Sequence, residues 1–236
     1  MMCDSERVTD DTPDATPGAA DATPDGRARR LRRRWDREAS GYDRAFAAAE
    51  ARMFPDVRRR LCALARGDVL EVAVGTGLNL PHYPPAVTGG RLVGVEWSPG
   101  MLDVARQRAD GLGVDVDLRL GDAQRLDLPD SSVDTAVCTF SMCAIADERA
   151  ALAEMVRVLR PGGRLLLADH VTSTFWPLRA LQAVADLVSV PWAGEHFGRR
   201  PMRWVAARAE AGELVVEQHE RTRAGVIEWV AAAVPA

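Results

Sequence analysis

The chain has 236 residues, which is long enough for one α/β domain with a sizeable core and a tail. Hydrophobic residues make up 47% of it, charged residues 27%, and the formal net charge is −4. This mild acidic balance argues against general nucleic-acid binding, which usually shows as a basic surface, so we expect no nucleic-acid partner.

The expected cellular location of the protein follows from its N-terminal residues, its apolar runs and its cysteine spacing. No apolar run reaches membrane-spanning length, and the N-terminal residues are acidic and polar rather than signal-like. The four cysteines, Cys3, Cys62, Cys138 and Cys143, have neither a CxxC nor a zinc spacing. We therefore predict a reduced, cytoplasmic protein with no metal site and no integral membrane segment, either a monomer or a homodimer. Peripheral contact with a membrane stays open.

The N-terminal region divides into two parts. Residues 1–26 are rich in Asp, Thr, Pro and Ala and are expected to form a disordered tail, because they cannot bury enough apolar surface to offset ordering entropy. Residues 27–37, RARRLRRRWDR, are strongly basic. A solvated helical face is favoured here over a contact with anionic lipid or an acidic partner. Residues 27–236 are predicted to form a single domain.

Strand and helix patterns then alternate along the chain. Short apolar runs at 69–74, 91–96, 114–120, 133–140 and 163–171 predict five buried strands. Helices are expected at 99–111 and at 148–159, the second ending at a Pro-Gly-Gly stop. Such alternation predicts a mainly parallel sheet with right-handed crossovers.

The C-terminal part has a different pattern. Residues 174–190 are expected to form an amphipathic helix within an inserted segment, 172–200, that would act as a lid over a bound substrate. The apolar residues of this helix could contact an apolar substrate or pack in the hydrophobic core of the protein, and their spacing favours the core. They are Phe175, Trp176, Leu178, Leu181, Val184, Leu187 and Val188, continued by Trp192. After another helix at 201–211, two apolar runs joined around Gly225 predict an antiparallel hairpin that closes the sheet.

A glycine loop follows the first predicted strand, in EVAVGTG at 71–77. Gly75 and Gly77 would let the backbone approach a ligand closely at the carboxyl end of the sheet, where open α/β sheets bind ligands. The dinucleotide-binding spacing GxGxxG fails, because Leu80 stands where the third glycine would be.

Carboxylates follow the next two strands. Glu96 ends the second strand, where it could accept hydrogen bonds from both hydroxyls of a ribose, and Asp122 follows the third, where it could meet an adenine amino group. A solvated charge at a strand end is the alternative for Glu96 alone. Together, the three strand ends describe a site for a nucleoside with a short polar tail rather than for a dinucleotide.

The ordered set of motifs resembles the class I S-adenosylmethionine-dependent methyltransferases over residues 42–171. The motifs are ExxxGxG, the acid followed by SPGML, GDA, and VLRPGGRLLL. Within that class, VGTGLNLPHYP, CTFSMCAIAD and ALAEMVRVLRPGG are similar to the quinone-biosynthesis methyltransferases and, most of all, to bacterial phosphatidylethanolamine N-methyltransferases. The resemblance implies a Rossmann-like α/β fold: a seven-stranded, mostly parallel sheet with a C-terminal antiparallel hairpin and helices on both faces.

The resemblance also implies that S-adenosyl-L-methionine is the methyl donor. Glu71 would anchor the glycine loop, Glu96 would hold the ribose, and Tyr42 would close over the methionine end. The other residues assigned to the donor are Ala73, Gly75, Thr76, Gly77 and Asn79 around the loop, Trp97, Met101, Asp122 and Ala123 around the adenine, and Thr139 near the sulfonium. Ala73 departs from the family pattern, which usually has a glycine there, and this puts donor affinity in doubt.

Catalysis would consist of aligning an acceptor atom in line with the methyl group and the departing sulfur. An oxygen or thiol acceptor needs a base, and His170, at the end of the fifth strand, is the first candidate, with His196 of the inserted segment the second. A merely structural role at the rim is as well supported for His170. The residues predicted to contact the acceptor are His82, Tyr83, Met142, Cys143, Trp176, Trp192, Glu195 and Arg199.

The leading hypothesis is a methyltransferase acting at N, O or S of a small or amphipathic molecule. Phospholipid N-methylation is the nearest alternative, followed by C-methylation of a quinone ring, which is weakened because the fourth strand lacks the Arg-Asn pair of that group. A nicotinamide-dependent oxidoreductase and a non-catalytic donor-binding protein are the alternatives of other classes.

Overall fold

A computed structural model describes residues 26–53, 55–222 and 225–236, with 47–49 and 51–53 as backbone only. The tail expected to be disordered lies outside the described residues except for Gly26, which begins the first helix. The basic run at 27–37 belongs to that helix, α1 (Gly26–Met53).

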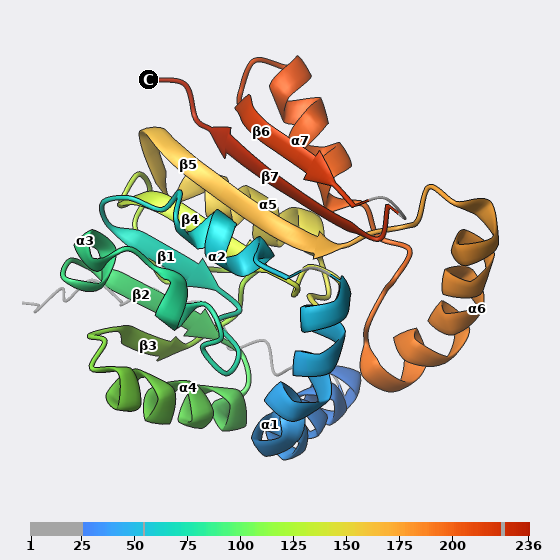
Figure 1. Ribbon diagram of the computed structural model, residues 1–236. Coiled ribbons are helices and arrows are strands. Elements are labelled where there is room, and N and C mark those ends of the chain that lie inside the picture. The colour runs from blue at the N-terminus through green and yellow to red at the C-terminus, as the bar shows by residue number, and fades with distance from the viewer. Residues whose placement is uncertain (1–25, 54, 223–224) are drawn as a thin grey trace, which may run out of the picture.

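One seven-stranded sheet organises the chain (Figure 1), in the order β3-β2-β1-β4-β5-β7-β6. Its strands are β1 (Val69–Val72), β2 (Leu92–Glu96), β3 (Asp117–Leu120), β4 (Val133–Thr139), β5 (Leu159–His170), β6 (Val215–Arg221) and β7 (Ile227–Ala233). The first five run parallel, whereas β7 pairs antiparallel with β5 and β6. This confirms the predicted parallel sheet and the C-terminal hairpin.

Helices cover both faces of the sheet, because its central strands are apolar on both faces. Leu70 and Val72 of β1 belong to a core shared with α5 (Glu148–Arg157) and α7 (Pro201–Glu210). Val69 points the other way, into a second core with α2 (Val57–Cys62), η1 (Leu80–His82) and α3 (Pro85–Thr88). The alternation of neighbouring residues between two cores follows from the two-residue repeat of a strand.

Capping residues fix where the helices nearest the strand ends begin. Ser98 precedes α4 (Pro99–Leu112), and its hydroxyl accepts a hydrogen bond from the Met101 amide at 3.2 Å. Asp147 caps α5 in the same way, accepting from the amides of Arg149 and Ala150. Each cap satisfies amides that have no partner inside the helix.

The fifth strand begins earlier than predicted. The Pro-Gly-Gly segment expected as a helix stop already belongs to β5, which pairs Leu159 with Val133 before the register shifts and Arg164 pairs with Thr135. Gly162, with a φ of 75°, lies within that irregularity, so the glycine lets the strand start with a bulge instead of ending a helix.

The helix of the inserted segment, α6 (Trp176–Ala193), lies away from the sheet at the right edge of Figure 1. None of the helices in the described part of the chain has the length and apolar character needed to cross a bilayer.

Candidate active site

A cavity of about 500 Å³ lies at the carboxyl ends of the parallel strands. Its floor comes from the ends of four strands, with Ala73 and Gly75 after β1, Glu96 ending β2, Asp122 after β3 and Phe140 after β4. A volume of this size is typical of small-molecule sites. The cavity therefore occupies the place where parallel α/β sheets bind their ligands.

Glu96 is buried in the floor of the cavity. One of its carboxylate oxygens accepts from the Gly75 amide at 3.0 Å and the other from the Ser98 amide at 2.8 Å. Burial raises the pKa of Glu96, while these backbone N–H groups and that of Trp97 lower it. The carboxylate thus ties the glycine loop to the start of α4 and lines the cavity at once.

Gly75 leaves room that a side chain would fill. Its φ is 58°, and a Cβ built there meets no protein atom closer than 4.0 Å, although the residue lines the cavity. The space above this backbone is therefore open to a ligand. Gly77, with a φ of 80°, instead packs toward Leu80, whose Cδ1 lies 2.9 Å from the Cβ position.

A buried polar network lies next to the floor. Glu71 accepts from the Asn79 amide at 2.9 Å and from the Tyr83 hydroxyl at 2.8 Å, and burial raises its pKa to about 7. Arg58 donates to the side-chain oxygens of Asn79 at 3.0 Å and Thr139 at 2.6 Å. The network fixes the loop after β1 against the end of β4.

Helix α1 lies across the cavity from the strand ends and forms the wall opposite the floor, here called the roof. Asp36 accepts from the Ser98 hydroxyl at 2.6 Å and from the Gly100 amide at 3.1 Å, and Asp43 accepts from Thr76 at 2.7 Å. The residues that α1 contributes to the cavity are Arg27, Ala28, Leu31, Trp35 and Tyr42. Two aspartates thus hold the roof to the turn after β2 and to the glycine loop after β1.

Comparison with known proteins identifies the domain that builds this cavity. Residues 70–167 match the family described as "Methyltransferase domain". The match agrees with the resemblance to methyltransferases predicted from the motifs, and residues 70–167 make up less than half of the chain. Those residues span β1 to β5 and supply the whole floor of the cavity.

Relatives and solved structures agree with this family. A phosphatidylethanolamine N-methyltransferase of Cereibacter sphaeroides is 37% identical over 130 residues, covering 53% of this chain and 63% of that protein. A demethylmenaquinone methyltransferase of Deinococcus radiodurans is 44% identical over 104 residues, covering 43% of this chain and 42% of that protein. The chain therefore matches about half the length of these relatives. A SAM-dependent methyltransferase of Aquifex aeolicus shares the fold, with a TM-score of 0.61 at 19% identity, covering 84% of this chain and 98% of the other.

Nine of the residues predicted to form the site line the cavity of the methyltransferase domain. They are Tyr42, Ala73, Gly75, Glu96, Trp97, Met101, Asp122, Ala123 and His196. Five more belong to the layer that supports it: Glu71, Asn79, Tyr83 and Thr139 in the polar network, and Thr76 in the contact with Asp43. The assignments of Thr139 to the sulfonium and of Tyr83 to the acceptor are thus not reflected in the cavity lining.

His170 lies outside the cavity lining. Its ring contacts Phe46 edge-on at 6.0 Å and Phe140 at 5.3 Å between centroids. Burial and the nearby Arg58 charge lower its pKa to about 4. His196 does line the cavity, held by a hydrogen bond from its amide to the Cys143 carbonyl at 2.9 Å.

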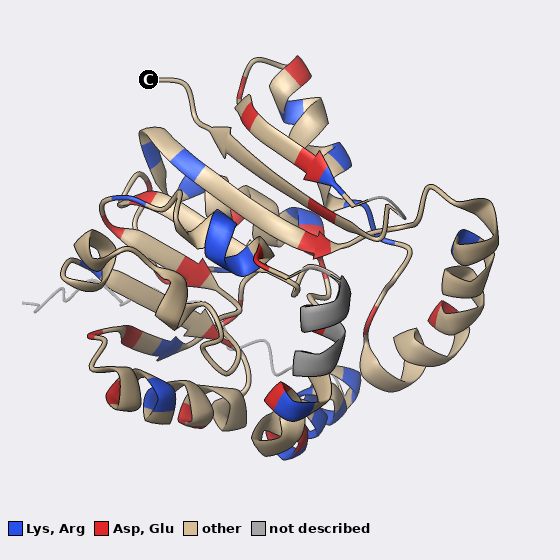
Figure 2. Cartoon of the chain, viewed as in Figure 1, with Lys and Arg blue, Asp and Glu red and all other residues tan. Residues whose placement is uncertain are grey.

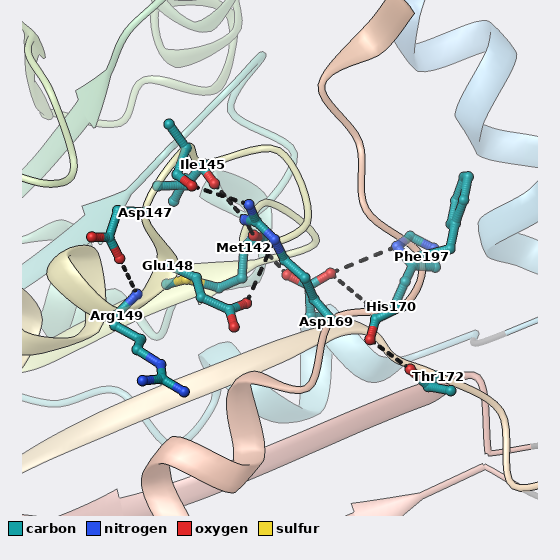
Figure 3. A network of polar contacts seen from close by, with 12 residues as sticks. Met142, Ile145, Asp147, Glu148, Arg149, Asp169, His170, Thr172 and Phe197 are labelled. Atoms are coloured by element: carbon teal, nitrogen blue, oxygen red, sulfur yellow. Dashed lines mark hydrogen bonds and ion pairs between the residues drawn. The ribbon is translucent and has the colours of Figure 1, made fainter. Parts of the chain in front are cut away.

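The loop after β4 is held from below by Asp169 (Figure 3). Its carboxylate accepts from the amides of Met142 and His170, both at 2.6 Å, and burial raises its pKa to about 7. Potential metal-ligand atoms of Cys143, Asp169 and His170 lie within 4.8 Å of one another. Because both oxygens of Asp169 already accept main-chain amides, we assign this trio to loop positioning.

The remaining residues predicted for the acceptor lie around the rim or away from it. Arg199 donates to the carbonyls of Met142 at 2.5 Å and Ala146 at 3.1 Å, so it braces the loop after β4. His82 is half-buried at the end of η1, Met142 and Cys143 are buried residues of that loop, and Glu195 precedes His196. Trp176 and Trp192 lie exposed at the two ends of α6.

Apart from Tyr42, the sequence interpretation missed the residues of the roof, and it also missed the buried Arg58. The α1 residues Leu31 and Trp35 lie inside a run of arginines that indicates a solvated helix, and Arg58 follows an ordinary amphipathic pattern. The acidic residues Asp36 and Asp43, spaced two turns apart, were the signal in the sequence that this helix contacts polar groups, which the structure shows to be Ser98 and Thr76.

Proposed function

We propose that the chain is an S-adenosyl-L-methionine-dependent methyltransferase acting at N, O or S of an amphipathic molecule. The observation that carries this proposal is a cavity whose lining combines two kinds of surface. Gly75 and Glu96 line it with open backbone and a carboxylate at the strand ends, and Leu31, Trp35 and Phe140 add apolar side chains.

The lining residues at the strand ends fit the donor. Glu96 offers a buried carboxylate to the ribose hydroxyls, Asp122 lines the cavity after β3 where the adenine edge would lie, and Met101 and Trp97 supply apolar contact for the adenine ring. The open space above Gly75 accommodates the amino-acid portion. The donor supplies a methyl group already activated by a positively charged sulfur, so the protein need not provide a covalent nucleophile.

The protein's own contribution is then orientation and exclusion of water. The α1 roof, held by Asp36 and Asp43, closes the site over the floor, and Tyr42 lines the cavity from that roof. His196 is the base best placed to take a proton from an oxygen or thiol acceptor. A low pKa, caused by burial and by Arg199, keeps it neutral at neutral pH.

The apolar residues of the lining support an acceptor with a hydrocarbon part. Leu31, Trp35, Phe140 and Ile145 offer it nonpolar surface inside the cavity. Similarity to a phosphatidylethanolamine N-methyltransferase makes phospholipid N-methylation the first specific acceptor to try. A demethylmenaquinone-like quinone is the second.

Calorimetric titration with S-adenosylmethionine, S-adenosylhomocysteine and NADH tests the donor site. We expect micromolar binding of both adenosyl ligands and none of NADH. Glu96→Ala should weaken adenosyl binding about 10- to 100-fold, the loss expected for hydrogen bonds to a charged group. Glu213→Ala, an exposed carboxylate after α7, is the matched control and should bind like the native protein.

Thermal unfolding of Glu96→Ala and of Glu96→Gln separates a lost ligand contact from a lost fold. Absence of binding by the folded native protein would overturn the proposal together with the donor-binding alternative, and NADH binding would favour the oxidoreductase. Once donor binding is established, labelled donor with phospholipid, quinol, amine and thiol acceptors identifies the substrate. His196→Ala should then lower kcat for an O or S acceptor without changing donor affinity.

A further inference from the structure

Helix α6 has its polar face inward and its apolar face outward. Gln182 bonds the Ser173 amide and the Val171 carbonyl, Asp186 accepts from the amides of Phe197 at 2.7 Å and Gly198 at 3.0 Å, and Ser189 donates to Glu195. These residues, spaced three or four apart, form one stripe of the helix. The connecting segments therefore occupy the polar stripe and leave the opposite one uncovered.

The sequence spacing favoured core for the apolar set, and the structure corrects this. Leu187 is 75% exposed and Trp192 69%. Of the eleven exposed large hydrophobic residues in the described part of the chain, seven lie on this segment: Phe175, Trp176, Leu181, Val184, Leu187, Val188 and Trp192. A contiguous apolar surface of this kind marks a contact with a partner or a membrane rather than with water.

Arginines flank the apolar stripe at its C-terminal end. The guanidinium of Arg34 lies 3.9 Å from the centre of the Trp192 ring, and Arg27 donates to the Val190 carbonyl at 3.0 Å. The groove between α1 and this end of α6 is lined by Arg27, Arg30, Arg33, Arg34 and Arg37, with Leu31, Pro191 and Trp192. Its two acids are engaged, Asp36 with Ser98 and Glu38 with Arg34.

A second group of arginines lies near the N-terminal end of α6. Arg179 lies in the first turn of α6, and Arg221 donates to the carbonyl of Thr172, just before that helix. The Thr172 amide donates to the Arg199 carbonyl, which brings Arg200 and the start of α7 with Arg203 to the same end. Figure 2 shows α6 almost entirely tan, beside a blue-rich α1. The apolar stripe is thus bounded by positive charge at both ends.

The cavity reaches the surface at the same place. Arg27 and Leu31 line both the cavity and the arginine groove, and Gly194 and His196, just after α6, line the cavity. An acceptor entering here would pass between the arginines of α1 and the end of the apolar stripe.

We propose that α6 and the arginines of α1 dock the protein on an anionic lipid bilayer. The apolar stripe would lie in the headgroup–acyl boundary, with Trp176 and Trp192 at the interface where indole rings concentrate. The arginines would contact anionic headgroups. The proposal deepens the proposed function by naming where an amphipathic acceptor would enter, although docking does not depend on methyl transfer.

A second copy of the chain fits this surface less well. An isologous contact through α6 would bring equivalent patches of two copies together. The arginine groups at the ends of the stripe would then lie near those of the other copy, and like charges across an interface oppose association. Anionic headgroups match the apolar stripe and the arginines at once.

Sedimentation of the full chain with vesicles tests the docking surface. We expect binding to vesicles of phosphatidylcholine mixed with phosphatidylglycerol, weaker binding to phosphatidylcholine alone, and loss of binding at high salt. Val184→Asp combined with Leu187→Asp should abolish binding, whereas Val215→Asp, at an exposed apolar position on β6, should not. Arg30→Gln with Arg33→Gln should bind about 30-fold more weakly, and Arg106→Gln on α4 serves as its control.

Calorimetry with S-adenosylhomocysteine on the same variants keeps this inference separate from the proposed function. Unchanged donor binding together with lost vesicle binding supports docking through this surface. Native protein that stays in the supernatant with both kinds of vesicle overturns the proposal, and so do variants that sediment like the native protein. Light scattering that shows a native dimer, dissociated by Val184→Asp with Leu187→Asp and without vesicle binding, overturns it in favour of a second copy.

Discussion

At the residue scale, Ala73 occupies a backbone conformation that favours glycine. It follows β1 with a φ of 55° and lines the cavity, where the family pattern usually has glycine. An L-residue with a side chain in the left-handed region costs roughly 1–2 kcal/mol. Phe140, also on the cavity wall, has a φ of 54°, so the strain gathers around the proposed donor site.

Ala73→Gly should therefore raise the free energy of unfolding by about 1 kcal/mol, since relief of the left-handed strain outweighs the added freedom of the unfolded chain. Urea denaturation measures this change. Ala183→Gly, at an exposed position within α6, is the matched control and should lower stability by roughly 0.5–1 kcal/mol. A destabilised Ala73→Gly protein would show that the methyl group, not the conformation, governs this position.

The site residues at the strand ends could be predicted because their position in the sequence directly after a buried strand places them in the fold. Glu96 and Gly75 follow buried strands, and the carboxyl ends of parallel strands necessarily meet at one edge of a sheet. Arg58 and Thr139 could not be paired in advance, because their hydrogen bond joins residues 81 positions apart. His170 was expected at the rim because it ends β5, but the direction of its ring depends on packing against Phe46 and Phe140, which no periodicity specifies.

At the element scale, the position of α1 depends on a close approach to α4. A Cβ built on Gly100 would lie 2.8 Å from the Cα and the carbonyl oxygen of Asp36, both backbone atoms that cannot move without moving the helix. Gly111, near the end of the same helix α4, has no atom within 4 Å of its Cβ position. An alanine at Gly100 would therefore clash with the backbone of α1, whereas an alanine at Gly111 would meet no neighbouring atom.

We expect Gly100→Ala to displace α1 and weaken donor binding, because the roof over the cavity would no longer close. Hydrogen exchange of α1 amides should become faster, and calorimetry should show weaker S-adenosylhomocysteine binding. Gly111→Ala should instead stabilise the protein by roughly 0.5–1 kcal/mol, the usual gain from alanine inside a helix, with donor affinity unchanged. Native donor affinity in Gly100→Ala would show that α1 is not part of the site.

Helix α6 illustrates what periodicity can and cannot predict about an element. The apolar spacing correctly indicated a helix, with bounds within three residues of those observed at either end. The same spacing indicated a buried apolar face, whereas in the structure the partly buried stripe of Gln182, Asp186 and Ser189 contacts the neighbouring segments instead. The pattern gives two faces but does not say which one the rest of the chain covers.

At the scale of the whole molecule, the fold was predictable because every level of the sequence agreed. Five apolar strand patterns alternated with capped helices, and the short link around Gly225 left β6 and β7 no arrangement but a hairpin. The relation of α1 and α6 to the sheet was not predictable, because it depends on a few long-range contacts such as those of Asp36 with Ser98 and of Arg34 with Trp192.

The buried ionisable groups couple the stability of the whole molecule to pH with opposite signs. Burial raises the pKa of Glu71 from 4.5 to about 7, so the folded state holds a proton that the unfolded state has lost over that range. The contribution of Glu71 to the free energy of unfolding is therefore present below pH 4.5 and is lost as pH rises toward 7. Burial and Arg58 lower the pKa of His170 from 6.5 to about 4, so its contribution is present above 6.5 and is lost as pH falls toward 4.

Comparing each residue with a neutral variant isolates these contributions, because the other titrating groups are common to both proteins. The stability of the native protein relative to Glu71→Gln should fall between pH 5 and pH 7, on the order of 1 kcal/mol per pH unit for one proton. Relative to His170→Gln, it should rise between pH 4 and pH 6.5. Urea denaturation across this range measures both differences. If the native curve runs parallel to that of either variant, the corresponding residue does not titrate differently in the folded and unfolded states. The Glu71 network would then be hydrated, or the His170 ring would lie in contact with water, and either finding would contradict the packing beneath the cavity.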